Sequence, residues 1–97
     1  MESRRMKEIK RQTEFADGTI LKADAGENGD DLWIWMQDEH DKNNSFVRLA
    51  RLLSDPEKTA KITYTIGDDV QEFEGFTLLD TLKMDGGKIS ARLKKER

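Results

Sequence analysis

The sequence contains no cysteine, one proline and one histidine among its 97 residues. Without cysteine the chain has no disulfide framework, no thiolate zinc site and no thiol nucleophile, and a reducing compartment suits it. No apolar run approaches the roughly 20 residues that span a bilayer, and the basic start of the chain lacks the apolar stretch of a secretory signal. We therefore expect a cytoplasmic protein with no membrane segment, no cofactor and no metal.

Charged side chains make up 38% of the chain, above the roughly 25% of typical globular domains, and they are unevenly distributed. Residues 1–12 carry five basic and two acidic side chains, and residues 88–97 carry five basic and one acidic. Because the whole chain has a net charge of −3, the segment between them carries −10. The two basic ends either form one positive face on an acidic body or are solvated tails. We expect one domain over residues 1–97, with frayed ends at residues 1–8 and 95–97.

Four turn signals share a glycine beside Asp or Asn, the combination that tight hairpin turns favour. They lie at residues 17–18, 28–29, 67–69 and 85–87. The runs between them predict six strands, at residues 9–15, 19–25, 32–37, 61–66, 70–84 and 88–95. Gly75 lies inside the fifth run, so we expect a bend or bulge there.

The segment after the third strand has helical periodicity. Phe46, Leu49, Ala50 and Leu53 fall at i, i+3, i+4 and i+7 and so share one helix face. A motif that begins at Ser54 predicts a further single turn. The expected fold is α+β with the order β-β-β-α-β-β-β, in which two three-stranded antiparallel meanders flank one short helix. The strands form either a single sheet with the helix packed on one face or a small half-open barrel.

The third strand is apolar on both faces. One face carries Leu32, Ile34 and Met36, and the other carries Trp33 and Trp35. The two tryptophans either pack in the core or anchor an interface. In the last strand Arg92 and Lys94 face outward. We predict Trp33, Trp35, Arg92 and Lys94 as the binding residues.

Residues 38–41, Asp-Glu-His-Asp, form the most concentrated ionisable group. Four consecutive side chains point in different directions and do not converge on a metal, so a polar connection is the favoured interpretation. Asp80 interrupts the apolar side of its strand, and it marks either the wet end of the strand or a register shift at a bulge. The phosphate-loop and nucleophile-elbow motifs are absent. We predict no catalytic and no metal-ligating residues, and a hydrolase or metal enzyme around His40 ranks last among the alternatives.

Three segments resemble those of small hypothetical proteins in prophages and mobile elements of Gram-positive bacteria. They are residues 14–20 (Glu-Phe-Ala-Asp-Gly-Thr-Ile), the helical segment at residues 45–53 and the meander at residues 76–93. The resemblance implies a virion-assembly or accessory role rather than an enzyme.

The sequence thus predicts a non-enzymatic protein–protein interaction or structural module, whose partners are other protein chains or a second copy of itself. The alternative is a nucleic-acid accessory protein that uses the basic ends. The acidic net charge and the lack of aromatic residues within those ends disfavour this alternative.

Overall fold

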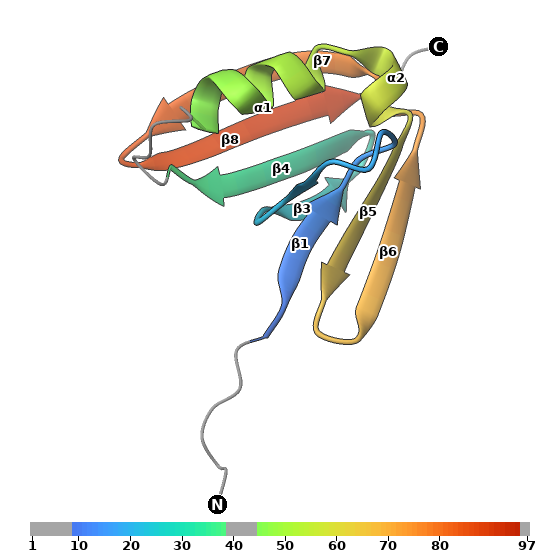
Figure 1. Cartoon of the computed structure of the whole chain (residues 1–97). Coiled ribbons are helices and arrows are strands. Elements are labelled where there is room, and N and C mark those ends of the chain that lie inside the picture. The colour runs from blue at the N-terminus through green and yellow to red at the C-terminus, as the bar shows by residue number, and fades with distance from the viewer. Residues whose placement is uncertain (1–8, 39–44, 96–97) are drawn as a thin grey trace, which may run out of the picture.

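Figure 1 shows the computed structural model, which describes residues 9–38 and 45–95. The elements within these residues are β1 (Arg11–Glu14), β2 (Ile20–Leu21), β3 (Asp24–Asn28), β4 (Asp31–Gln37), α1 (Ser45–Leu53), α2 (Pro56–Thr59), β5 (Lys61–Ile66), β6 (Asp69–Glu74), β7 (Leu78–Asp85) and β8 (Lys88–Lys94). The predicted α+β class is confirmed. Residues 1–8, 96 and 97 of the predicted frayed ends lie outside the described residues.

The strands form two four-stranded antiparallel sheets. Sheet A has the order β2-β1-β5-β6, and sheet B has the order β3-β4-β8-β7. All four predicted turns close hairpins, but each hairpin of the first half of the chain pairs with a hairpin of the second half, β1 with β5 and β4 with β8. The prediction of two three-stranded meanders, one on each side of the helix, is therefore corrected, because the two halves of the chain interleave. The strands form two four-stranded sheets, which differs from both expected arrangements, the single sheet and the small half-open barrel.

The physical reason is a corner after β2, at Lys22 and Ala23, which we call the first corner. The sequence predicts one strand over residues 19–25, whereas the structure ends β2 before the corner and begins β3 after it. The Ala23 N–H donates to the Leu21 carbonyl at 2.9 Å, and a bond between residues two apart turns the chain sharply. Leu21, Ala23 and Ala25 are all buried. The predicted alternation of buried and exposed side chains thus continues through the corner, although the residues before the corner belong to sheet A and those after it to sheet B.

A second corner, at residues 75–77, joins β6 of sheet A to β7 of sheet B. Gly75 has a φ of 88°, a backbone conformation that residues other than glycine adopt only with strain. The Gly75 N–H donates to the Ala60 carbonyl at 3.2 Å. The predicted bend at Gly75 is confirmed. Strands that switch sheets at such corners are typical of steeply crossed sheets, and Figure 1 shows β1, β5 and β6 running at a steep angle to β4 and β8.

Both helical segments are short. In α1 the leucines 49, 52 and 53 are buried, while Ala50 of the predicted face is only partly buried. The carboxylate of Asp55 accepts a hydrogen bond from the Glu57 N–H at 3.0 Å, so Asp55 rather than Ser54 caps α2. Within the residues that the structure describes, no helix is long and apolar enough to cross a membrane.

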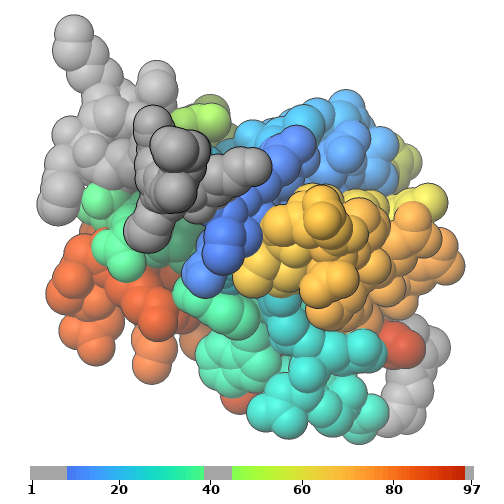
Figure 2. All heavy atoms as spheres, turned by 90° about the horizontal axis from the view of Figure 1, so that it is seen from below, coloured from blue at the N-terminus to red at the C-terminus, as the bar shows by residue number. Residues whose placement is uncertain are grey.

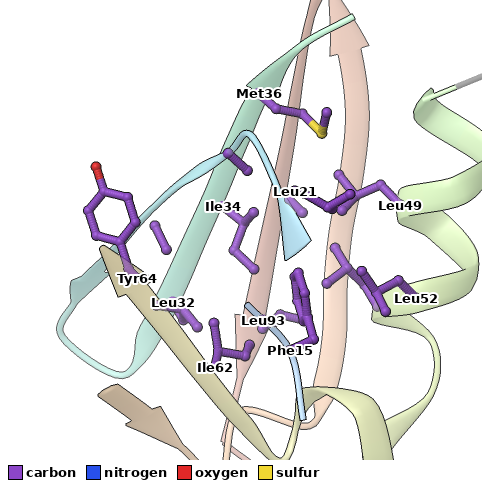
Figure 3. Packing of buried hydrophobic residues seen from close by; sticks show 14 of the residues in the cluster. Phe15, Leu21, Leu32, Ile34, Met36, Leu49, Leu52, Ile62, Tyr64 and Leu93 are labelled. Atoms are coloured by element: carbon purple, nitrogen blue, oxygen red, sulfur yellow. The ribbon is translucent and has the colours of Figure 1, made fainter. Parts of the chain in front are cut away.

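The core lies between the inner face of sheet B and a layer made of sheet A and α1. Figure 3 shows Leu49 and Leu52 pointing from α1 into the interior that Phe15 and Ile34 also enter. Each fully buried aliphatic or aromatic side chain stabilises the fold by about 1.5–3 kcal/mol relative to an exposed one. Because α1 and sheet A occupy the inner side of sheet B, the outer side of sheet B is the one left to solvent.

Candidate binding face

The outer face of sheet B brings together all four residues that the sequence predicts for binding. Along β4 and β8 the burial alternates, with one side of each strand fully buried and the other partly exposed. Trp33, Trp35, Arg92 and Lys94 share the partly exposed side. We use the name tryptophan face for these four residues together with the residues around them on the same side, Gly26, Asp31, Asp80 and Thr81.

Trp33 and Arg92 form the centre of the tryptophan face. They lie directly opposite each other in the β4–β8 pairing. The Cζ atom of Arg92 lies 5.4 Å from the centroid of the Trp33 ring, which is within the range of a cation–π contact. Trp33 is consequently covered in part by its own neighbour and remains partly exposed to solvent.

Asp80 and Thr81 hold the Arg92 guanidinium in place. Arg92 Nε donates to Asp80 Oδ2 at 2.8 Å, and Arg92 Nη2 donates to the Thr81 hydroxyl at 3.2 Å. The hydrogen bond from Arg92 lowers the pKa of Asp80 below its ordinary value. Since both partners are about one-third exposed, the pair contributes little to the stability of the fold. Its main effect is to fix the orientation of Arg92.

A bulge in β7 directs Asp80 outward. The β7–β8 pairing joins Leu79 to Leu93 and then Thr81 to Arg92, so β7 contains one extra residue at Asp80. Of the two alternatives predicted for Asp80, the structure shows the register shift, but the bulge lies at Asp80 itself and not at Gly75. Asp80 is an exposed partner of Arg92 rather than a buried carboxylate.

Lys94 is also paired. Its Nζ lies 2.8 Å from Asp31 Oδ1, and the two residues are opposite each other in the β4–β8 register. The two basic residues of the tryptophan face, Arg92 and Lys94, therefore each have a carboxylate partner. The face combines an aromatic centre with balanced charge.

Trp35 lies over the bare backbone of Gly26 on the neighbouring strand. A Cβ atom placed on Gly26 would lie 3.6 Å from Cη2 of the Trp35 ring. An aromatic ring that covers a glycine on a neighbouring strand is a recognised way to stabilise a sheet. Trp35 stays partly exposed on the outer side, so both tryptophans belong to the surface layer of sheet B rather than to the central core.

Four residues of the tryptophan face were not predicted for binding, and of these the sequence singled out only Asp80, as an interruption of its strand. Gly26 is a glycine inside a strand, a signal for the close approach of another group. Asp31 and Thr81 carry no such signal, because their positions on the face depend on the register between strands.

The other predicted cluster, residues 38–41, is described only at Asp38, whose N–H donates to the Gly87 carbonyl at 2.8 Å. His40 lies outside the described residues. Over residues 9–38 and 45–95, no three His, Asp or Glu side chains are grouped closely enough to hold a metal ion. No family model, no curated protein and no solved structure matches this chain.

Proposed function

We propose that this chain is a non-enzymatic protein-interaction or structural module that contacts other protein chains through the tryptophan face. The observation that carries the proposal is the pair Trp33 and Trp35, partly exposed on the outer side of sheet B, with Arg92 against Trp33. Tryptophan and arginine are enriched among the residues that dominate interface energetics.

The tryptophan face is also pre-organised. Arg92 is fixed by Asp80 and Thr81, and the Trp35 ring lies over Gly26. A partner that binds here therefore immobilises few side chains that were free before, and this lowers the entropic cost of association.

The charge pairing favours a protein over a nucleic acid. Nucleic-acid binding requires lysine and arginine side chains that neutralise phosphates and release their counterions. Arg92 and Lys94 already have carboxylate partners. The nucleic-acid alternative rests on the basic ends, of which residues 9–12 and 88–95 are described. A phage-type assembly or accessory role in the cytoplasm, suggested by the sequence resemblance, fits an interaction module.

A second copy of the chain is the partner to test first. A symmetric dimer uses the same patch on both copies, so the patch must be complementary to itself. The tryptophan face has apolar rings at its centre, and the pairs Arg92–Asp80 and Lys94–Asp31 supply both signs of charge beside them. Such a face meets the requirement.

Sedimentation velocity over a wide range of protein concentration tests this form of the proposal. We expect the native chain to self-associate and the double variant Trp33→Ala, Trp35→Ala to remain monomeric. Val70→Ala is the matched control, because Val70 is a strongly exposed apolar residue on β6, outside the face. A strictly monomeric native chain removes the second copy as a partner. Association that persists in the double variant removes the tryptophan face as the contact.

A further inference from the structure

A cleft of about 710 Å3 lies beside the first corner, between the start of β1 and the end of β4. Figure 2 views the molecule from below and shows the blue start of β1 between the gold β5–β6 hairpin and the green end of β4. The cleft is lined in part by Ile9, Ile20 and Trp35. Trp35 is thus a member of the tryptophan face that also lines the cleft.

The first corner creates the cleft. Because the chain leaves sheet A at Lys22, β2 pairs with β1 only at Thr13 and Glu14. Likewise β3 begins too late to pair with Met36 and Gln37, which pair only with β8. Within the described residues, the start of β1 and the end of β4 therefore present strand edges without a neighbour on the cleft side.

The walls of the cleft expose apolar side chains. Ile9 is 63% exposed and Ile20 is 51% exposed, although isoleucine is among the residues most often buried. Leu21 and Met36, which also line the cleft, are buried. An apolar side chain of a binding partner can therefore be buried in the cleft.

The charge around the cleft is positive. Three basic side chains, Lys10, Arg11 and Lys22, line it together with one acidic side chain, Asp24. Arg11 lies 3.6 Å from Asp24, whereas Lys10 and Lys22 have no ion-pair partner among the described residues. This local excess of positive charge contrasts with the acidic segment between residues 13 and 87 and favours an anionic occupant.

We propose that the cleft binds an extended, acidic segment of a partner protein that carries apolar side chains between its carboxylates. An extended segment pairs its backbone with the open edge of β1, as in strand addition to a sheet. Its apolar side chains contact Ile9 and Ile20, and its carboxylates approach Lys10 and Lys22. The inference goes beyond the proposed function and does not depend on self-association through the tryptophan face.

Fluorescence anisotropy with the chain of residues 1–97 tests the cleft. The probes are a labelled peptide of alternating Glu and Val, a matched peptide of alternating Lys and Val, and a labelled oligothymidine strand. We expect only the Glu–Val peptide to bind, with an affinity that falls as salt is added. Ile20→Glu and Lys22→Glu should each weaken this binding about tenfold, equivalent to about 1.4 kcal/mol.

Val70→Glu is the matched control, since it makes the same change at a strongly exposed β-branched residue outside the cleft, and it should leave binding unchanged. Lys22→Glu keeps the test valid if Ile20→Glu unfolds, because Lys22 is exposed. No binding of the Glu–Val peptide, or equal binding of both peptides, overturns the proposal. Binding of the oligothymidine strand that Ile20→Glu abolishes assigns the cleft to nucleic acid instead. Trp33→Ala separates the two sites, since Trp33 does not line the cleft and its loss should affect only self-association.

Discussion

The first corner contains no glycine, whereas the second is built on Gly75 with its positive φ of 88°. At the first corner the buried Thr13 hydroxyl donates to the Ala23 carbonyl at 2.8 Å. At the second corner Phe76 is 1% exposed and packs edge-on against Phe73, with ring centroids 6.5 Å apart. At both corners the chain leaves sheet A and enters sheet B. A hydrogen bond from a neighbouring strand stabilises the first corner, whereas backbone conformation and aromatic packing stabilise the second.

This difference bears on the cleft beside the first corner. Phe76 fills the space where β6 turns into β7. At the first corner the corresponding residues are Lys22, which is exposed, and Ala23, which is small. The adjoining ends of β1 and β4 consequently remain open, and the same bend that joins the sheets leaves a candidate binding site.

Replacement of Phe76 by alanine should have the largest effect. Removal of a buried phenylalanine side chain leaves a cavity and costs about 3–5 kcal/mol, a large part of the roughly 5–15 kcal/mol that stabilises a typical domain. Urea denaturation measures the loss. Phe76→Leu is the control and should cost less than about 1.5 kcal/mol. A loss below about 1 kcal/mol for Phe76→Ala would show that burial of the Phe76 side chain does not hold the second corner.

The strands and turns could be predicted because their signals are local. Glycine next to Asp or Asn marks all four hairpins, and residues 61–66 alternate as β5 does. The pairing of the hairpins could not be predicted, because alternation identifies the inner face of a strand but not its neighbour. The first corner was missed because Leu21, Ala23 and Ala25 stay buried on both sides of it.

Replacement of Thr13 by valine tests the hydrogen bond at the first corner. Valine keeps the shape of threonine but leaves the Ala23 carbonyl without its donor, and an unsatisfied buried polar group costs about 1–3 kcal/mol. Thr13→Ser retains the hydroxyl and loses only a methyl group, which costs about 0.8 kcal/mol. Denaturation of the two variants in parallel gives the comparison. If both are destabilised equally, the hydroxyl does not hold the corner.

Replacement of Gly75 by alanine tests the backbone of the second corner. A side chain in the left-handed region costs about 1–2 kcal/mol, and no atom lies within 4 Å of the position that the new Cβ would take. The loss is therefore conformational rather than steric. Gly26→Ala is the control, because Gly26 lacks a positive φ and a Cβ there makes only ordinary contact with Trp35. A thermal melt should show destabilisation only for Gly75→Ala, and similar melts for both variants would contradict this account of the corner.

The same distinction between local and non-local information applies to the tryptophan face. The alternation in residues 32–37 places Trp33 and Trp35 on one side, and the outward direction of Arg92 follows from its own strand. The contact between Arg92 and Trp33 depends on the β4–β8 register, and the partnership with Asp80 depends on the bulge. The sequence therefore predicts the members of the face but not the contacts among them.

Tyr64 reports on the first corner through Asp24, the first residue of β3. The Tyr64 hydroxyl donates to Asp24 Oδ1. Burial, reinforced by this hydrogen bond, raises the pKa of Tyr64 from its ordinary value of 10 to about 12. Near neutral pH, Tyr64→Phe should cost only about 0.5–1.5 kcal/mol, the net value of one hydrogen bond, because Asp24 keeps Arg11 as a neighbour.

The effect of Tyr64→Phe should depend on pH in a direction that follows from the raised pKa. Between about pH 10 and about pH 12 the unfolded chain loses the phenolic proton of Tyr64 while the folded chain keeps it. Tyr64 therefore contributes its full stabilisation below about pH 10, and this stabilisation is lost as the pH rises toward 12. The difference in stability between the native chain and Tyr64→Phe should therefore shrink over this interval. Because the chain contains one tyrosine, the ultraviolet absorbance of tyrosinate follows Tyr64 alone. A midpoint near pH 10 in the folded protein would show that Tyr64 is neither buried nor held against Asp24 beside the first corner.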